Sequence, residues 1–265
     1  MLRPVNADLD LALRLADTAD AITLSRFRAS DLRVERKPDR TPVTDADTAA
    51  EDALRAQIAA ERPDDEVVGE ERGGELTASG RAWVLDPIDG TKNYSRGLGV
   101  WGSLIALTEH GEPTVGVASS PALGRRWWAA RGEGAWTSDG PGLPARRIAV
   151  SGVRELADAY LSTTDFRVFV RQGRGEQYQR LATSCWETRA FGDFWQYCLV
   201  AEGVIDLAVD PVANPWDLAA VAPIVVEAGG AFTDLRGAPR FDGGDGLASN
   251  GAVHDAALAI IGTRA

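Results

Sequence analysis

The sequence predicts a layered fold in which α-helices pack on β-sheets. Three observations support this: stretches with helical spacing of apolar residues, short apolar runs bounded by turn residues, and both kinds of element in each half of the chain. Mixed elements in this order are typical of layered α/β and α+β proteins. With 265 residues, 45% of them hydrophobic, the chain is long enough to bury a large core in a single domain, residues 1–265.

The first elements are two helices. From residue 8 to about 28, leucines, alanines and an isoleucine recur at helical spacing, which predicts a long amphipathic helix. Residues 36–42 are expected to form a loop because of their prolines and charges. Thr44 or Asp45 then caps a second helix that runs to about Ala60. After it, residues 69–80 are expected to be a strand end followed by a mobile loop.

Strands and helices then follow in both halves. Turns containing glycine separate four expected strands, at 83–85, 103–108, 114–119 and 126–130. Residues 138–147 are the clearest internal linker, which predicts two lobes of about 1–140 and 145–265. In the second half we expect strands at 159–162 and 205–209 and helices at 191–202 and 217–229, the last ended by Gly229 and Gly230.

Composition excludes several classes of function. A net charge of −11 argues against a nucleic-acid-binding surface, because such surfaces neutralise phosphates with Lys and Arg. The only cysteines, Cys185 and Cys198, are not in a CxxC arrangement, and His110 and His254 are far apart. A zinc site or a histidine-based nucleophilic triad is therefore not expected. No apolar run reaches membrane length, so a soluble cytoplasmic protein without a membrane partner is expected.

The segment 83–93, WVLDPIDGTKN, combines several features of a metal and phosphate site. An apolar strand leads into Asp86, and Pro87 ends the strand ladder because it has no N–H. Asp89 follows three residues later across a tight turn, so both carboxylates can point the same way. Gly90 permits close backbone approach, and Gly90 with Thr91 can open a short helix whose N–H groups suit a phosphate. Either aspartate alone is better explained as a turn residue, but their combination with a glycine and a hydroxyl at a strand end favours a function.

Three further acidic motifs accompany this segment: Glu70 after an apolar run, Asp217 at the start of an apolar helix, and Asp47 in Thr44–Asp47. Each alone is explained as a solvated loop or a helix cap. Together with Asp86 and Asp89 they supply oxygen ligands and no nitrogen or sulfur ligands. That set is the preference of Mg²⁺ or Mn²⁺ rather than Zn²⁺ or Cu²⁺.

At these motifs the chain resembles the inositol monophosphatase superfamily, which includes histidinol-phosphate and fructose-bisphosphate phosphatases. The matching strings are GEE (69–71), WVLDPIDGTKNY (83–94) and PWDLAA (215–220), supported by TPVTDAD (41–47) and AEGVIDLAV (201–209). The resemblance covers nearly the whole chain in the same order. It implies an αβαβα sandwich of the inositol monophosphatase–fructose bisphosphatase type, usually a homodimer, with two or three Mg²⁺ ions, or Mn²⁺, between the layers.

The resemblance also implies a role for each motif residue. One Mg²⁺ would be held by Glu70, Asp86 and the Ile88 carbonyl, and a second by Asp86, Asp89 and Asp217. A weaker third ion would lie near Glu70, which also counts among the catalytic residues. Asp47 and Thr91 match positions that orient or deprotonate the attacking water, and the Gly90 and Thr91 amides would bind the phosphate. Paired cations need no protein nucleophile, because they lower the pKa of a bound water and neutralise the phosphate.

The expected substrate is a small phosphate ester, most similar to that of the bacterial histidinol-phosphate phosphatases. This narrower resemblance lies in segments 89–94, 100–107, 121–136 and 189–203. Histidinol phosphate carries an ammonium group, so its pocket should hold extra carboxylates and aromatic faces. Asp193 and Asp210 are the candidates to pair with the ammonium, and Arg189 to shape the pocket or a dimer contact. Asp193 is equally well explained as a helix cap.

Other functions remain open at this point. Within the superfamily, an inositol-1-phosphate phosphatase or a broad sugar- and nucleotide-phosphate phosphatase is the alternative. A non-enzymatic, metal-binding regulatory protein is an alternative of a different class. Residues 97–102 match the dinucleotide-binding pattern GxGxxG, but a strand rather than a helix is expected after them, which argues against that function.

Overall fold

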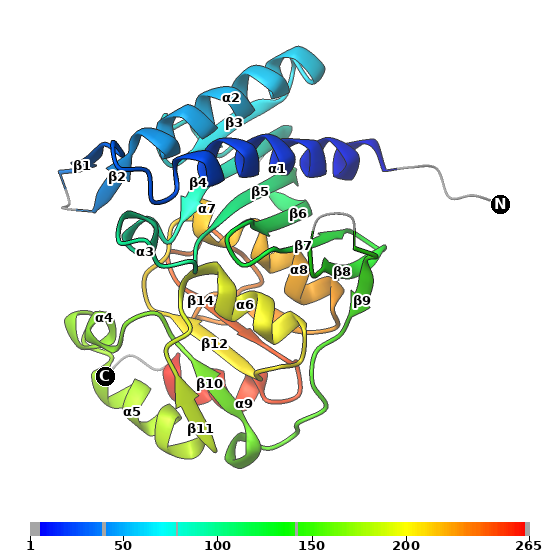
Figure 1. Cartoon of the computed structure of the whole chain (residues 1–265). Helices are drawn as coiled ribbons and strands as arrows, with labels where there is room; N and C mark the ends of the chain where they lie inside the picture. Colours follow the sequence, from blue (N-terminus) through cyan, green and yellow to red (C-terminus); the bar gives the residue numbers. More distant parts are fainter. Residues whose placement is uncertain (1–5, 39–40, 78, 141–142, 263–265) are drawn as a thin grey trace.

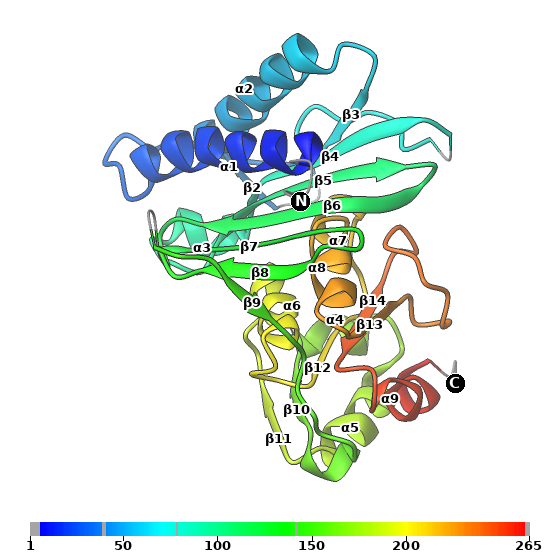
Figure 2. The ribbon, with the colours of Figure 1, turned by 90° about the vertical axis from the view of Figure 1, so that its right-hand side faces the viewer.

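Two β-sheets alternate with three layers of helices in the computed structural model, which describes residues 6–38, 41–77, 79–140 and 143–262 (Figures 1 and 2). The first sheet has the strand order β3-β4-β5-β6-β7-β8-β9. Its strands are antiparallel except for the parallel pair β3 and β4. Their bounds are β3 (Glu66–Gly69), β4 (Arg81–Asp89), β5 (Gly102–Glu109), β6 (Glu112–Ser120), β7 (Arg125–Ala130), β8 (Gly134–Ser138) and β9 (Arg146–Ile148).

Helices α1 (Ala7–Arg26) and α2 (Asp45–Glu61) cover one face of this sheet (Figure 2). Leu11 and Leu15 of α1 and Leu54 of α2 are fully buried against Trp83 and Leu85 of β4. Val84 points to the opposite face and packs in the central core, as alternation along a strand requires. A small hairpin of β1 (Val34–Arg36) and β2 (Pro42–Thr44) connects the two helices.

The second sheet has the order β11-β10-β12-β14-β13 and is separated from the first by a layer of helices (Figure 1). The middle layer contains α6, α7 and α8, and α4, α5 and α9 lie on the far side of the second sheet. The short α3 (Thr91–Ser95) follows β4, and a 3₁₀ turn, η1 (Leu156–Asp158), precedes β10. The remaining bounds are β10 (Tyr160–Ser162), α4 (Phe166–Arg171), α5 (Gly175–Ser184), β11 (Glu187–Arg189), α6 (Asp193–Ala201), β12 (Leu207–Asp210), α7 (Pro215–Leu218), α8 (Val221–Glu227), β13 (Ala231–Thr233), β14 (Gly246–Ser249) and α9 (His254–Ile261).

Most of the predicted elements are found, and two of them differ because of a proline. The predicted end of the strand ladder at Pro87 is wrong: β4 continues to Asp89, and its register with β5 shifts between Asp86 and Asp89. A bulge of this kind accommodates a proline without ending the strand. The helix predicted over 217–229 is two short helices, because Pro223 has no N–H to continue the ladder of α7 and instead lies in the first turn of α8.

The predicted loop and linker are also shorter than expected. Arg36 and Pro42 belong to the β1–β2 hairpin, and residues 39–40 lie outside the described residues. Arg146 and Arg147 belong to β9, which pairs with β8, so the end of the predicted linker is part of the first sheet. Residues 141–142 of that linker lie outside the described residues. Within the described part of the chain, no helix is long and apolar enough to cross a membrane.

Candidate metal centre

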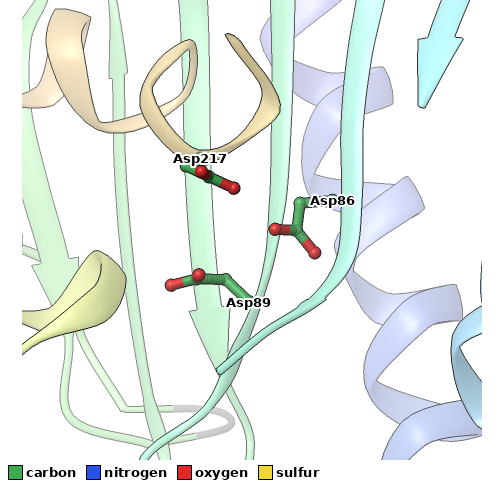
Figure 3. A group of neighbouring side chains, drawn as sticks. All are labelled: Asp86, Asp89 and Asp217. Carbon is green, nitrogen blue, oxygen red and sulfur yellow. The ribbon is translucent and has the colours of Figure 1, made fainter. Parts of the chain in front are cut away.

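Three carboxylates meet between the first sheet and the middle helices: Asp86 and Asp89 on β4 and Asp217 on α7 (Figure 3). One oxygen of each lies within 4.8 Å of the others. Asp86 and Asp89 would face opposite sides of a regular strand, since they are an odd number of residues apart. The bulge at Pro87 and Ile88 corrects this, so both carboxylates face Asp217.

Backbone groups hold these carboxylates in place. The Ile88 N–H donates to Oδ1 of Asp86 at 3.0 Å, across the bulge. The Phe194 N–H, in the first turn of α6, donates to Oδ2 of Asp89 at 2.5 Å. Asp217 is the third residue of α7 and accepts from the Asn214 N–H at 2.7 Å, so it caps its helix as well as facing the cluster. Three separate elements therefore fix the three side chains.

Burial and mutual repulsion raise the pKa of all three carboxyls. For Asp86 burial acts first, then the charges of Glu70 and Asp89. For Asp89 burial is followed by the charges of Asp193 and Asp217, and burial raises the pKa of Asp217 to about 7. Among the described residues no Lys or Arg forms an ion pair with any of them. A compact, anionic, all-oxygen set without a protein counter-ion fits a hard divalent cation such as Mg²⁺.

Glu70 lies beside this group but outside the set of mutually close oxygens. It follows β3, and its N–H donates to the Leu85 carbonyl of β4 at 3.2 Å, which places it next to Asp86. Its Oε1 accepts from Nζ of Lys37 at 2.6 Å, and Lys37 also donates to Glu71 at 2.8 Å. Nothing in the sequence pattern had indicated Lys37, because its loop carries no recognisable spacing relative to Glu70.

Asp47 and Thr91 are in contact, as their predicted shared role requires. The Thr91 hydroxyl lies 3.3 Å from Oδ1 of Asp47 and 2.9 Å from the Ile88 carbonyl oxygen. Oδ2 of Asp47 accepts from the Thr44 N–H at 2.8 Å, so Asp47 also closes the capping box of α2. Burial raises the pKa of Asp47 to about 7. One carboxylate oxygen of Asp47 therefore caps α2, and the other contacts Thr91.

The three predicted substrate residues differ in their surroundings. Asp193 begins α6 with a left-handed backbone (φ 48°), is preceded by the N-cap Gly192, and accepts from Nδ2 of Asn93 at 3.2 Å. Burial, followed by the charge of Asp210, raises its pKa to about 6. Asp193 is thus not the helix cap.

Asp210 and Arg189 have other partners. Asp210 is buried, and its Oδ2 accepts from Gln196 at 2.5 Å and from the Tyr197 hydroxyl at 2.9 Å. Arg189 is exposed and donates to Glu187 at 2.6 Å, and none of its described contacts joins it to the carboxylate cluster. Sequence reasoning missed three groups that bind the candidate site residues: the Phe194 amide and the side chains of Asn93 and Lys37.

The described residues also enclose a separate cavity of about 550 Å³ between α1 and the ends of β6, β7 and β8. Leu13 and Leu24 of α1, Trp128 of β7 and Leu143 supply much of its apolar lining. None of its lining residues is a predicted site residue. This cavity is therefore separate from the carboxylate cluster.

Comparison with known sequences identifies the family. The sequence model of the inositol monophosphatase family matches residues 6–262. The chain belongs to the inositol monophosphatase family. Among curated family relatives, a histidinol-phosphatase of Mycobacterium tuberculosis is 53% identical over 95% of this chain and 96% of that protein. A histidinol-phosphatase of Streptomyces coelicolor is 50% identical over 97% of both chains.

The inositol monophosphatase fold is also found by structural comparison. A solved inositol monophosphatase from Zymomonas mobilis superposes with a TM-score of 0.85 at 34% identity, covering 98% of this chain and all of that one (100%). The layered αβαβα arrangement expected from the sequence is therefore confirmed. Three of the motifs on which the resemblance rests lie at the end of β3, on β4 and on α7, and the last two of these elements carry Asp86, Asp89 and Asp217.

Proposed function

We propose that this protein is a Mg²⁺-dependent phosphate monoesterase that hydrolyses L-histidinol phosphate to L-histidinol and phosphate, in histidine biosynthesis. The observation that carries the proposal is the cluster of Asp86, Asp89 and Asp217, buried or half-buried, which no described Lys or Arg neutralises. The choice of substrate is supported by two curated histidinol-phosphatases, to which this chain is 53% and 50% identical.

The metal ligands follow from the donor set. Asp86, Asp89, Asp217 and Glu70, with the Ile88 carbonyl, would hold two Mg²⁺ ions, with Asp86 shared, and a third ion would lie nearer Glu70. When bound, the ions supply charge neutralisation of the phosphate and a bound water of lowered pKa. The protein supplies a rigid site: amides of Ile88, Phe194 and Asn214 already orient the three clustered carboxylates.

Asp47 and Thr91 are proposed to handle the proton of the attacking water. The Thr91 hydroxyl can donate to Oδ1 of Asp47, which leaves its oxygen free to accept from water. Because the pKa of Asp47 is raised to about 7, this carboxylate can take up a proton near neutral pH. Its other oxygen stays bonded to Thr44, so the orientation is kept as the proton moves.

The phosphate would lie at the Gly90–Thr91 turn. Gly90 has a φ of 84°, and a Cβ there would stand 3.1 Å from the Val100 carbonyl and 3.4 Å from Oδ2 of Asp193. Glycine therefore allows the turn between β4 and α3 to pack closely. We propose that the Gly90 and Thr91 amides bind phosphate oxygens there.

Asp193 is proposed to bind the substrate ammonium. Its carboxylate is close to the Gly90 turn and to Asn93, so it faces the position proposed for the phosphate. Asp210 would act less directly, because its oxygens are bonded to Gln196, Tyr197 and the Thr164 amide. Arg189, on the edge strand β11, is proposed at the pocket rim or a homodimer contact rather than at the reacting atoms.

A cytoplasmic homodimer is the proposed form of the protein. Trp186 is 70% exposed next to the edge strand β11 and forms a ring contact with Tyr160, so a second copy that covered this edge would bury it. Sedimentation of the purified protein should give twice the mass of one chain. A single-chain mass at micromolar concentration would rule out the homodimer and leave the chemistry unaffected.

The test is phosphate release by purified protein from histidinol phosphate, inositol 1-phosphate, fructose 1,6-bisphosphate and an adenosine bisphosphate, each with Mg²⁺ and with EDTA. We expect Mg²⁺-dependent release with a strong preference for histidinol phosphate. A preference for inositol 1-phosphate, which the likeness to the Zymomonas mobilis inositol monophosphatase supports as the second candidate, would keep the chemistry and change the substrate. Absence of release from every ester would favour a non-enzymatic metal-binding protein.

A further inference from the structure

An ion pair between a fully buried carboxylate and a half-buried arginine lies directly behind the turn of residues 69–73, which carries Glu70 and is called the Glu70 turn below. Glu51, on α2, is 0% exposed, although a carboxylate is costly to bury. Its Oε1 accepts from Nε of Arg55, one turn further along α2, at 2.8 Å. Neither residue belongs to the motifs that define the metal site, and neither contacts Asp86, Asp89 or Asp217 among the described hydrogen bonds.

Glu51 binds the two amides that follow Glu70. Its Oε2 accepts from the Glu71 N–H at 2.8 Å, and its Oε1 accepts from the Arg72 N–H at 3.1 Å. The carboxylate also lies against Gly69, where a Cβ would stand only 2.2 Å from Oε1. Gly69 therefore has to be glycine for Glu51 to reach the turn, since any side chain would displace the carboxylate.

Arg55 binds the carbonyls at the two ends of the same turn. Its Nη1 donates to the Val67 oxygen at 3.1 Å and its Nη2 to the Gly73 oxygen at 2.5 Å. Gly69 and Gly73 close the turn with a reciprocal pair of backbone hydrogen bonds of 3.1 and 3.0 Å. The two side chains thus satisfy amides and carbonyls on both sides of Glu70, which leaves the backbone of the turn little freedom.

We infer that Glu51 and Arg55 are positioning residues for the metal centre: they fix the Glu70 turn so that its carboxylate is presented beside Asp86. This inference rests on the proposed function, in which Glu70 is a metal ligand. A carboxylate that holds a ligand-bearing turn acts on metal affinity without touching the metal. A purely structural pair would instead affect stability alone.

The primary test is metal binding by purified Glu51→Gln, measured with Mn²⁺ by electron paramagnetic resonance and with Mg²⁺ by calorimetry. Glutamine keeps the size of the side chain but has a single acceptor oxygen for three donors. We expect the dissociation constant for the metal to rise about 10- to 100-fold. Hydrogen exchange of the 70–73 amides should accelerate in the metal-free variant, while amides of the second sheet keep their protection.

Glu202→Gln is the matched control. Glu202 is also a buried carboxylate, 4% exposed, that binds two arginines and the Trp127 ring N–H, but it lies between α6 and β7, away from the Glu70 turn. The control should lower stability and leave the metal affinity unchanged. Equal metal affinity in wild type, Glu51→Gln and Glu202→Gln would overturn the inference.

A second variant decides the question if Glu51→Gln does not fold. Arg55→Lys keeps the charge that pairs with Glu51 but cannot reach the Val67 and Gly73 carbonyls together, because lysine lacks the guanidinium fork. Weaker Mn²⁺ binding by this variant supports the inference, and wild-type binding contradicts it. If wild type itself binds neither Mn²⁺ nor Mg²⁺, the proposed function fails and the inference fails with it, a result distinct from unchanged binding in the variants.

Discussion

The carboxylate cluster shows how single residues are selected for binding rather than for stability. Asp86, Asp89 and Asp217 lie together at buried or half-buried positions, so their charges repel one another in surroundings that stabilise charge poorly. Replacing any one of these aspartates with a neutral residue of the same shape should increase the stability of the metal-free protein. The arrangement is favourable only when a cation is bound, which is why such clusters mark functional sites.

Replacing Asp86 by asparagine tests this directly. Because Asp86 faces both Asp89 and Asp217, its neutralisation should remove Mg²⁺-dependent turnover and raise the stability of the metal-free protein by about 1 kcal/mol. Turnover is measured by phosphate release, and stability by urea unfolding in EDTA. Full activity in Asp86→Asn would contradict the metal site, and a large loss of stability without metal would contradict the account of repulsion.

Replacing Asp193 by asparagine tests recognition of the ammonium. Asparagine tolerates the left-handed backbone at this position, so the fold should be kept. Loss of a charged hydrogen bond should raise KM for histidinol phosphate roughly 10- to 100-fold and leave kcat nearly unchanged. The KM of an ester without an ammonium should not change. Equal effects on both esters would show that Asp193 acts on the site in general and not on the ammonium.

The pH dependence of KM follows from the same residue. The pKa of the free Asp193 carboxyl is raised to about 6, so it is neutral below that pH and cannot pair with an ammonium. In the wild type KM for histidinol phosphate should therefore increase as the pH falls below about 6. In Asp193→Asn the KM should be high and should increase less steeply than in the wild type as the pH falls through this range. A steady-state pH series with both proteins makes the comparison.

At the scale of elements, local patterns predicted helices and strands well where one rule applied. The capping residues of α2, and the short apolar runs bounded by turn residues in β5 and β6, were sufficient to place those elements. Helices α4, α5 and α9 and strands β11, β13 and β14 were missed, because each is short and its apolar residues are set by tertiary packing on the second sheet. Two predictions were wrong: that the strand ladder ends at Pro87 and that one helix runs over 217–229. Pro87 lies in a bulge of β4, and Pro223, in the first turn of α8, has no N–H to continue the ladder of α7.

The site shows the same division between local and long-range information. Asp86, Asp89 and Asp217 could be predicted from motifs, because the first two stand in one short segment and Asp217 stands in the first turn of an apolar helix. The contacts of Lys37, Asn93 and the Phe194 amide with the site residues could not, because they join segments far apart in the sequence. Asp210 shows a further limit: the motif gave its place in the chain but not the three partners that occupy its oxygens.

Glu202→Gln tests how much the contacts of one side chain between a helix and a sheet contribute to stability. Glu202 joins the end of α6 to the first sheet through the Trp127 ring N–H at 2.6 Å, Arg125 at 3.0 Å and Arg146 at 2.6 Å. These partners lower its pKa although burial opposes them. The variant should lose about 1–3 kcal/mol of unfolding free energy at pH 7 and keep its kcat. Urea unfolding measures the loss, and a change below about 0.5 kcal/mol would contradict the role.

At the scale of the whole molecule, stability, pH and metal are linked through the same carboxyls. The net charge of −11 and the buried cluster both oppose folding without a cation. Deprotonated carboxylates bind the metal, and the metal binds the folded chain, in which the ligands are brought together. Metal at 100 times its dissociation constant would add about 2.7 kcal/mol to the unfolding free energy. Removing it with EDTA should therefore lower the melting temperature.

The final prediction concerns how this linkage changes with pH. In the folded metal-free protein burial raises the pKa values of Asp47 and Asp217 from 3.8 to about 7, and burial and neighbouring charges raise those of Asp86 and Asp89 well above their usual range. Between about pH 5 and 8 the folded state thus binds more protons than the unfolded chain, and its stability must fall as the pH rises. Saturating Mg²⁺ replaces those protons, so the stability added by the metal should grow over the same range.

Urea unfolding at pH 5, 6, 7 and 8, with EDTA or Mg²⁺, should give two curves of unfolding free energy that diverge towards high pH. The metal-free curve of Asp86→Asn should have a shallower slope. Metal-free wild type that is most stable at pH 8 would show that these carboxyls are not protonated in the folded state, and that the cluster needs no cation to be tolerated.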